Sequence, residues 1–347
     1  GLRVIVGMYD GTIAVYGAKT GRTMRSLLGH VRSVSGIKPL KDNVHVATVG
    51  DDGTLRLWNA DTAQLLRTFI GHASDIFALD VTSDGARAVT ASYDGSVRLW
   101  NLGEASEDRQ RTPLTLAHQK ALLAPSCETA LVRDGIGERR HVSLASGVGV
   151  ALPPLEGTSS EWTLSSDGRT SAVALRSGAI ALVDLETRRN TFTLDGHDGN
   201  VGDLAFSPDG KWLLSGGFSD KTIRLWNLET HQSVATREFD AVYNVGVSPD
   251  SKWAITAGLE HLTVFSLPTL EPVGSSSQAG ASSPPFAFNP ASNLLALVRF
   301  YDVVTLLRLP SAEVTLSLML RPGAVGSLAF SPAGDRLLAA STDGALR

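Results

Sequence analysis

Three groups of histidine, hydroxyl and aspartate residues recur in this sequence at nearly constant spacing. A hydroxyl activated by an imidazole that a carboxylate orients is the arrangement of a hydrolytic triad, so each group could in principle support nucleophilic chemistry. In the first two groups the hydroxyl follows the histidine by 18 residues and the carboxylate follows it by 22, whereas in the third the carboxylate follows by 23. The three groups are His30, Thr48 and Asp52; His72, Thr90 and Asp94; and His197, Ser215 and Asp220.

The elements that carry these groups repeat with a regular period. The residue before each Asp-Gly-like turn recurs at intervals of 42, 42, 40, 43, 43, 39, 42 and 42 residues, at Tyr9, Asp51, Tyr93, Arg133, Arg176, Ser219, Gly258, Phe300 and Thr342. Each unit contains short runs typical of strands, such as VGDLAF (201–206), KWLLSGG (211–217), TIRLWNL (222–228) and SVATREF (233–239), separated by turns such as SPDG (207–210). Four short strands per ~42 residues predict one blade of a β-propeller.

The repeats resemble those of the WD-repeat β-propeller family, which run from a Gly-His pair to a Trp-Asp pair. The pairs present are Gly29-His30, Gly71-His72 and Gly196-His197, with Trp58-Asn59, Trp100-Asn101 and Trp226-Asn227 closing the units. The resemblance implies an all-β propeller of four-stranded antiparallel blades, with seven blades, or eight if the two ends combine. It covers residues 1–347 as a single region, with complete blades over about residues 31–322 and partial repeats at 1–30 and 323–347.

In this family the loop histidine, a second-strand Ser or Thr, the turn aspartate and the third-strand tryptophan form a hydrogen-bonded network. The resemblance therefore implies a structural role for the three groups and for Trp58, Trp100 and Trp226, each six residues after its aspartate. A buried carboxylate needs several donors, and a hydroxyl can extend the network to the indole N–H. A hydrolytic triad would instead need one exposed nucleophile beside an oxyanion site, which a set repeated in three blades and buried in their packing does not provide.

The sequence predicts no metal or cofactor site and no catalytic residue. The three Gly-His pairs are 42 and 125 residues apart and offer no convergent set of ligands. The run Asp51–Gly53 lacks the further oxygen ligands of a calcium loop. The single cysteine, Cys127, excludes an internal disulfide, and we interpret it as a small buried apolar residue.

The overall composition limits the classes of partner. The net charge of −4 gives no general electrostatic footprint for nucleic acid or acidic membranes, and no apolar run reaches the ~20 residues of a membrane span. We therefore expect no specific nucleic-acid or membrane partner, and a cytoplasmic location. The chain starts at Gly1 without a methionine and stops at GALR, within a pattern completed elsewhere as GSVRLWN. We interpret it as a fragment tethered to other domains of the same polypeptide.

The positions next to the network are better candidates for function than the network itself. The residue before each turn aspartate should reach the rim of one propeller face, near the central channel, and the loop residues after each Gly-His pair should face the same side. Tyrosine, phenylalanine and arginine at such positions are typical of interface hot spots. We predict a protein-binding face that comprises Tyr9, Asp51, Tyr93, Arg133, Arg176, Ser219, Phe300 and Thr342, with Arg32, Asp75 and Asn200 from the loops.

The function that the resemblance implies is a non-catalytic protein–protein interaction scaffold within a larger signalling or regulatory protein. The alternative is a propeller-fold hydrolase or lyase with a site at the central channel. That alternative requires non-repeating ionisable residues clustered at one end of the channel, and Arg133 and Arg176 are the two candidates from adjacent units. RNA-associated scaffolding is a third possibility, which the negative net charge disfavours.

Overall fold

The computed structural model describes residues 3–7, 11–17, 23–82, 84–103, 114–115, 118–123, 129–134, 139–143, 149–152, 155, 158–239, 244–258, 261–277, 286–300, 303–319, 325–331 and 333–341. The chain divides into two compact units, of which the first comprises residues 1–151, 285–305 and 317–347 and the second residues 152–284 and 306–316. The secondary structure of the described residues consists of β-strands. None of these residues lies in a helix of the length and apolarity that a membrane span requires.

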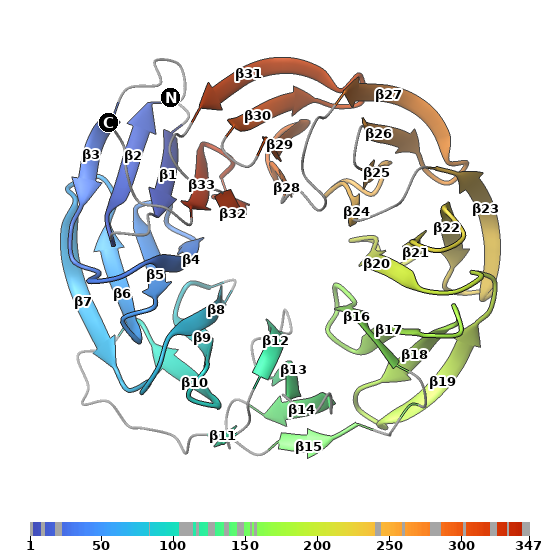
Figure 1. The fold of residues 1–347 in the computed structure, drawn as a ribbon, viewed down its shortest axis with the longest axis horizontal. Coiled ribbons are helices and arrows are strands. Elements are labelled where there is room, and N and C mark those ends of the chain that lie inside the picture. Colours follow the sequence, from blue (N-terminus) through green and yellow to red (C-terminus); the bar gives the residue numbers. More distant parts are fainter. Residues whose placement is uncertain are drawn as a thin grey trace. The chain divides into compact units, whose positions relative to one another are not determined.

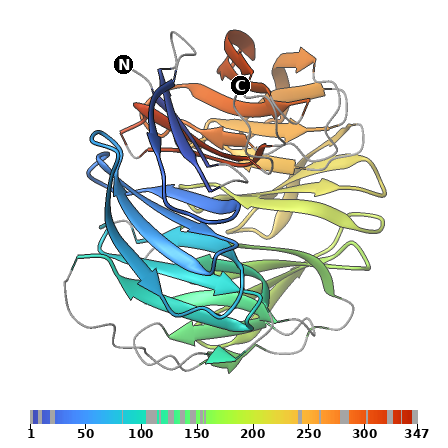
Figure 2. The ribbon, with the colours of Figure 1, turned by 60° about the vertical axis from the view of Figure 1, so that its left-hand side comes forward.

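The first unit contains three four-stranded antiparallel blades in chain order. They are β4 (Val34–Pro39), β5 (His45–Gly50), β6 (Thr54–Asn59) and β7 (Gln64–Ile70); β8 (Ile76–Val81), β9 (Arg87–Ser92), β10 (Ser96–Asn101) and β11 (Leu114–Thr115); and β12 (His118–Leu123), β13 (Thr129–Asp134), β14 (Arg139–Ser143) and β15 (Gly149–Ala151). Figure 2 shows the first two of these blades side by side, in blue and cyan, and strands β4 and β8 are in contact.

The second unit contains three further four-stranded antiparallel blades. They are β16 (Thr158–Leu164), β17 (Thr170–Leu175), β18 (Ile180–Asp184) and β19 (Arg189–Leu194); β20 (Val201–Phe206), β21 (Trp212–Gly217), β22 (Thr222–Asn227) and β23 (Gln232–Glu238); and β24 (Asn244–Val247), β25 (Trp253–Ala257), β26 (His261–Ser266) and β27 (Glu271–Ser277). The first strands β16, β20 and β24 contact one another in that order, so the blades of this unit pack through their first strands (Figure 1).

Two remaining sheets differ from this pattern. Strands β28 (Phe286–Phe288), β29 (Leu294–Arg299), β30 (Val303–Arg308) and β31 (Glu313–Met319) form a sheet in that order, and its residues are divided between the two units. A five-stranded sheet has the order β3-β2-β1-β33-β32. Its strands are β1 (Arg3–Gly7), β2 (Ile13–Gly17), β3 (Thr23–Leu27), β32 (Val325–Phe330) and β33 (Arg336–Ser341).

The expected number of blades, seven or eight, is therefore wrong. Antiparallel register through all three strand pairs is described for six four-stranded blades, β4–β7 through β24–β27. The two ends of the chain do not combine into an antiparallel blade, because each supplies a second strand, the strand that precedes an Asp-Gly turn. These two strands, β1 and β33, pair in parallel and give a mixed sheet of five strands.

The core lies between neighbouring blades and depends on the recurring tryptophans. The second strand of each blade that carries a Gly-His pair is buried on both faces, which suits its run of small and branched apolar residues. Trp58 packs with Ile5 and Val15 of the preceding sheet. Trp100 likewise packs with residues of the β4–β7 blade, and Trp226 with residues of the β16–β19 blade. Each tryptophan therefore closes its own blade and joins it to the preceding sheet.

Candidate protein-binding face

Two chain segments meet at one end of each repeat that carries a Gly-His pair. In the β4–β7 blade they are the loop that enters β4 (residues 28–33) and the turn between β5 and β6 (residues 51–53). A contact between His30 of the loop and Asp52 of the turn joins them. We call this the Gly-His end of a blade. The turns after the first and third strands lie at the opposite end, because successive strands are antiparallel.

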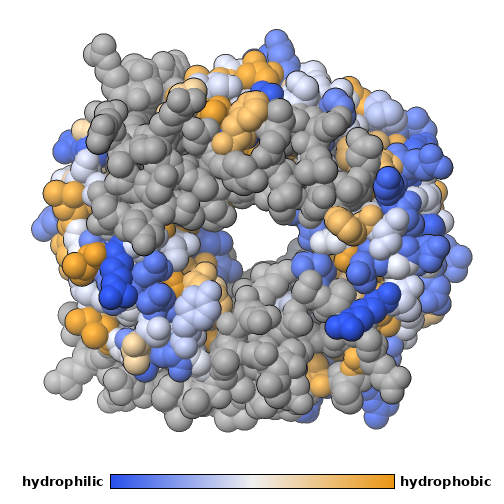
Figure 3. All heavy atoms as spheres, viewed as in Figure 1, coloured by the Kyte–Doolittle hydropathy of each residue, from blue (hydrophilic) through white to orange (hydrophobic). Residues whose placement is uncertain are grey.

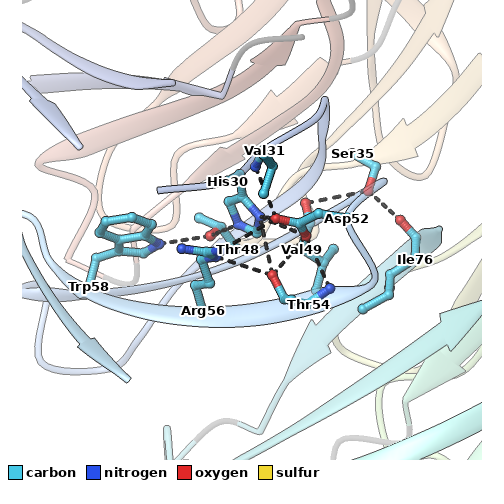
Figure 4. A network of polar contacts seen from close by, with 10 residues as sticks. All are labelled: His30, Val31, Ser35, Thr48, Val49, Asp52, Thr54, Arg56, Trp58 and Ile76. Carbon is cyan, nitrogen blue, oxygen red and sulfur yellow. Dashed lines mark hydrogen bonds and ion pairs between the residues drawn. The ribbon is translucent and has the colours of Figure 1, made fainter. Parts of the chain in front are cut away.

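The first network connects His30, Thr48, Asp52 and Trp58 (Figure 4). His30 Nδ1 lies 2.9 Å from a carboxylate oxygen of Asp52. On the other side of the ring, Nε2 lies 2.8 Å from Thr48 Oγ1. The indole N–H of Trp58 donates to the same hydroxyl oxygen at 2.8 Å. Four hydrogen-bonded side chains therefore link the loop, the second strand, the turn and the third strand.

Asp52 accepts further hydrogen bonds that fix the turn. The Val31 backbone N–H donates to it at 3.1 Å, and Thr54 donates both its backbone N–H, at 3.1 Å, and its hydroxyl, at 2.7 Å. Burial alone would raise the pKa of the Asp52 carboxyl, but the hydrogen bonds and charge interaction with His30, together with those from Thr54 and Val31, hold the pKa well below its usual range. Asp52 is therefore ionised at neutral pH.

The other two networks repeat this geometry. The imidazole Nδ1 atoms of His72 and His197 lie 2.9 Å from the carboxylates of Asp94 and Asp220, and their Nε2 atoms lie 2.7 Å from the hydroxyls of Thr90 and Ser215. Trp100 and Trp226 donate to these hydroxyl oxygens at 2.8 Å. Burial lowers the pKa of both histidines, against the raising effect of the aspartates. A neutral ring accounts for all the contacts, with Nδ1–H donating to the carboxylate and the hydroxyl donating to Nε2.

This geometry removes the hydroxyls from nucleophilic chemistry. Thr48, Thr90 and Ser215 are at most 1% exposed, and each hydroxyl oxygen already accepts an indole N–H. A substrate carbonyl has no path to an oxygen buried in this way. Among the residues that the structure describes, no group of three or more His, Cys, Asp or Glu side chains could hold a metal ion.

The prediction from the sequence left out an arginine that lies beside each of these networks. Arg56 Nε donates to Thr54 Oγ1 at 3.1 Å, and its Nη2 lies 3.5 Å from Asp52. The same guanidinium packs with Trp58 against Gly29, where a Cβ atom would lie 2.6 Å from Arg56 Nη1 and 2.8 Å from Trp58 Cη2. Gly71 and Gly196 meet Arg98 and Arg224 in the same way. The signal was present, because an arginine stands two residues before each of the three tryptophans.

The position before the turn aspartate is defined by one backbone hydrogen bond. The N–H of Asp51 donates to the carbonyl of Ser33 at 2.9 Å, and the N–H of Tyr93 donates to that of Asp75 at 2.9 Å. Tyr93 is 71% exposed, with its ring centroid 4.9 Å from that of Phe77.

In the β20–β23 blade the residue that makes this bond is Phe218, not the predicted Ser219. The Phe218 N–H donates to the carbonyl of Asn200 at 2.8 Å. Ser219 is the extra residue of this turn, and its hydroxyl accepts the Asn200 N–H at 3.1 Å. Lys221, with φ of 53°, then takes the left-handed conformation that Gly53 has in the first network. Counting forward from the second strand, rather than back from the aspartate, would have identified Phe218.

Three of the predicted face residues come together in the first unit, at a hollow of about 450 Å³ between the β4–β7 and β8–β11 blades. Arg32, Asp51 and Asp75 line it, together with Val31, Asp52, Gly53, His72, Ala73 and Ser74. Arg32 Nη1 lies 4.0 Å from Asp75. Burial, followed by the charge of Asp75, raises the pKa of the Asp51 carboxyl, and the charge of Arg32 opposes this rise. At Asp51 the charge of Asp75 therefore has a larger effect than the charge of Arg32.

The other predicted face residues lie elsewhere or cannot be placed. Phe300 is exposed after β29, and Arg176 is exposed in the turn between β17 and β18. Asn200 and Ser219 lie at the Gly-His end of the β20–β23 blade. Arg133 is part of β13, but its side chain is outside the described residues, and Tyr9, Thr342 and Cys127 lie outside them altogether.

On the face shown in Figure 3, hydrophobic and hydrophilic residues of the described part of the chain are interspersed. Exposed apolar side chains such as Leu28, Val31 and Ile70 flank the Gly-His pairs of the first unit, close in sequence to charged ones. A mixed surface of this kind is typical of non-obligate protein interfaces.

Comparison with known proteins identifies the repeats. The model of the WD domain, G-beta repeat, matches residues 21–59, 63–101, 188–227 and 317–347. The chain is 34% identical over 94 residues to WD repeat-containing protein 36 of Homo sapiens, which covers 27% of this chain and 10% of that protein. It is 37% identical over 67 residues to DDB1- and CUL4-associated factor 13 of Dictyostelium discoideum. The matched segment covers 19% of this chain and 15% of that protein. These matches thus span 15% or less of those relatives' own lengths.

A solved structure shares the fold. The Cps50 (Swd1) β-propeller domain of Myceliophteria thermophila matches with a TM-score of 0.58 at 17% identity, covering 77% of this chain and 94% of that chain. At this identity the similarity concerns the fold, which is a β-propeller.

Proposed function

Because the chain belongs to the WD-repeat β-propeller family, we propose that it is a non-catalytic protein-interaction scaffold whose partner, a protein or peptide, contacts the Gly-His ends of the blades. Residues 1–347 would then be one WD-repeat region of a larger signalling or regulatory protein. The names of its relatives support a role in assemblies, since one of them is called a DDB1- and CUL4-associated factor.

One observation carries the proposal: the Gly-His ends combine rigid backbone with exposed, non-repeating side chains. The buried networks hold the entering loop and the turn in fixed positions, so little conformational entropy is lost when a partner binds. The side chains displayed on this rigid support differ from blade to blade. Asp51, Tyr93 and Arg176 occupy the position before the turn in three blades, and chemically varied positions on a constant scaffold are where specificity resides.

The test is a quantitative comparison of two double variants. Tyr93→Ala with Arg176→Ala removes one exposed side chain at the Gly-His end of the β8–β11 blade and one at the corresponding end of the β16–β19 blade, in the second unit. Lys41→Ala with Lys211→Ala removes two exposed side chains from the turns at the opposite ends of their blades. Both variants should retain the parent's melting temperature, since none of the four side chains is buried.

The parent and both variants are then used to purify partners from cells that express the natural full-length protein, and affinities are measured with the purified partner. We expect the first variant to lose the partner and the second to retain it. Equal retention by both variants, or loss confined to the Lys41/Lys211 variant, would overturn the assignment of the face.

A further inference from the structure

The hollow at the Gly-His ends of the β4–β7 and β8–β11 blades is not part of the repeated network. Its distinctive residues, Asp51 and Asp75, have counterparts at the junction of the β16–β19 and β20–β23 blades in the second unit. There, Gly178 approaches the carbonyl of His197 as Gly53 approaches that of His72. Arg176 stands in place of Asp51 and Asn200 in place of Asp75. The same backbone therefore carries other side chains at these two positions in the second unit, so Asp51 and Asp75 are not required by the fold.

The charges in the hollow do not balance. Asp51, Asp52 and Asp75 contribute three carboxylates, whereas the nearby cations are Arg32 and Arg56, whose Nη2 lies 3.5 Å from Asp52. Burial holds the pKa of His72 below its usual value and leaves the ring neutral at pH 7. Asp52 is engaged by His30, Thr54 and Val31. Among the described residues, none donates a hydrogen bond to the side chain of Asp51 at the distances that define one. The Arg32 side chain is 70% exposed and reaches Asp75 only at 4.0 Å.

The walls of the hollow suit an aliphatic stem that carries a positive charge. Val31, which is 78% exposed, and Ala73 contribute apolar surface beside the carboxylates. Tyr93 is tied to Asp75 through its backbone N–H, and its exposed ring is packed on Phe77. Lysine and arginine side chains bury their methylene stems on apolar surface while their heads pair with carboxylates or lie over aromatic rings.

Building on the proposed function, we infer that this hollow receives a lysine or arginine side chain of the protein partner, with Asp51 and Asp75 pairing with its charged head and Val31 and Ala73 packing along its stem. Arg32 is the internal competitor: its flexible, exposed guanidinium partly neutralises Asp75 and must move aside when the partner's cation enters. The junction in the second unit has Arg176 and Asn200 in place of Asp51 and Asp75, with Asp198 in place of Ala73, and does not bind such a side chain.

The test uses small probes, so that it does not depend on knowing the partner. The chain is labelled with ¹³C in its alanine and valine methyl groups, and the Ala73 and Val31 signals are followed by NMR at low salt. The probes are butylguanidinium and butylammonium, which represent the two side chains, and butylurea, a neutral molecule shaped like butylguanidinium. We expect saturable shifts of both residues' signals with at least one of the cations and none with butylurea.

Three variants make the result specific. Asp51→Asn should weaken cation binding roughly tenfold, because each lost ion pair in a partly buried site is worth about 1 to 2 kcal/mol. Asp51→Arg with Asp75→Asn places the side-chain types of Arg176 and Asn200 in the hollow and should abolish cation binding, whereas Arg32→Ala should strengthen it. Equal shifts with butylurea and the cations, or cation affinity unchanged in Asp51→Asn, would overturn the inference.

These outcomes are distinguishable from failure of the proposed function. If the cations bind as described but the Tyr93/Arg176 variant retains its partners, the hollow is a cation site and the scaffold face lies elsewhere. If the Tyr93/Arg176 variant loses its partner while Asp51→Asn binds the probes as tightly as the parent, the proposed binding face is supported. The assignment of a basic side chain to the hollow is then wrong.

Discussion

His72 and Asp94, which are 22 residues apart in the chain, are joined by a contact of 2.9 Å between Nδ1 and a carboxylate oxygen. This pair links the loop that enters the β8–β11 blade to the turn between its second and third strands. Two equivalent pairs do the same in the β4–β7 and β20–β23 blades. The residues whose types most resemble a catalytic triad therefore form buried hydrogen-bonded links. These links make the surrounding surface rigid enough to present other side chains.

Replacing Asp94 should destabilise the fold markedly. The carboxylate accepts hydrogen bonds from the Ala73 and Ser96 backbone N–H groups, from the Ser96 hydroxyl and from His72. Asp94→Ala leaves these donors without their acceptor and should lower the free energy of unfolding by about 2 kcal/mol or more. Urea denaturation followed by circular dichroism measures this loss. Asp75→Asn, at a partly exposed carboxylate, is the control and should stay within about 0.5 kcal/mol of the parent.

The hydroxyl group of Thr48 should contribute more to the stability of the fold than the volume of its side chain does. Thr48→Val keeps the shape of the side chain but deprives the Trp58 indole and the His30 ring of their partner, and should cost about 2 kcal/mol. Thr48→Ser should recover most of the loss, because Ser215 fills this role in the third network. If the valine variant unfolds at the same urea concentration as the parent, the hydroxyl has no such role.

Gly29 should not tolerate even one added methyl group. A Cβ atom there would meet Arg56 Nη1 at 2.6 Å and the Trp58 ring at 2.8 Å, and the ring cannot move without disturbing the core. Gly29→Ala should cost about 1 to 3 kcal/mol, as is usual for overpacking. Gly103→Ala is the matched control, since among the described residues its Cβ would have no neighbour closer than 3.8 Å. Equal melting temperatures for the two variants would show that the close approach at Gly29 is not required.

The stability of the protein should fall as the pH is lowered from neutral. The folded-state pKa values of His72 and His197 are below the ordinary value of 6.5, so the unfolded chain binds more protons once the pH falls below about 6.5. The carboxyl pKa values of Asp52, Asp94 and Asp220 are also lowered, and their contribution is lost as the pH falls below about 4.

The first part of this pH dependence can be assigned by substitution. Unfolding free energies measured from pH 8 to pH 5 should decline in the parent. The slope should be smaller in a His72→Gln, His197→Gln variant, whatever its absolute stability. A slope that is the same in both proteins would show that these histidines are not the groups responsible.

Much of the fold and of the network could be predicted from the sequence, because both follow from local repetition. The spacing from His72 to Thr90, Asp94 and Trp100 reflects strand lengths, and the same intervals bring these residues together in the structure. The blade count could not be predicted in this way. Repetition identifies β1 and β33 as second strands, but it does not indicate that two second strands would pair in parallel within one sheet.

The candidate site was less predictable than the network. Asp51 and Asp75 were both selected as face residues, but their proximity in one hollow depends on the packing of β4 against β8, which a single repeat does not encode. Phe218 was missed because an inserted residue shifts the turn by one position relative to the aspartate. Arg56 was not predicted because the expected network consisted of histidine, hydroxyl, carboxylate and indole groups, whereas its guanidinium contacts Thr54 and Asp52 beside them.

The central claim is that partners contact the Gly-His ends of the blades, and hydrogen exchange of the chain with and without its purified partner tests it most directly. The account predicts slower exchange on binding in peptides that contain residues 30–33, 51–54 and 72–75, and unchanged exchange in the turns at the opposite ends of the same blades, residues 40–44 and 60–63. Slower exchange confined to those opposite turns or to the outer strand β7 would contradict it.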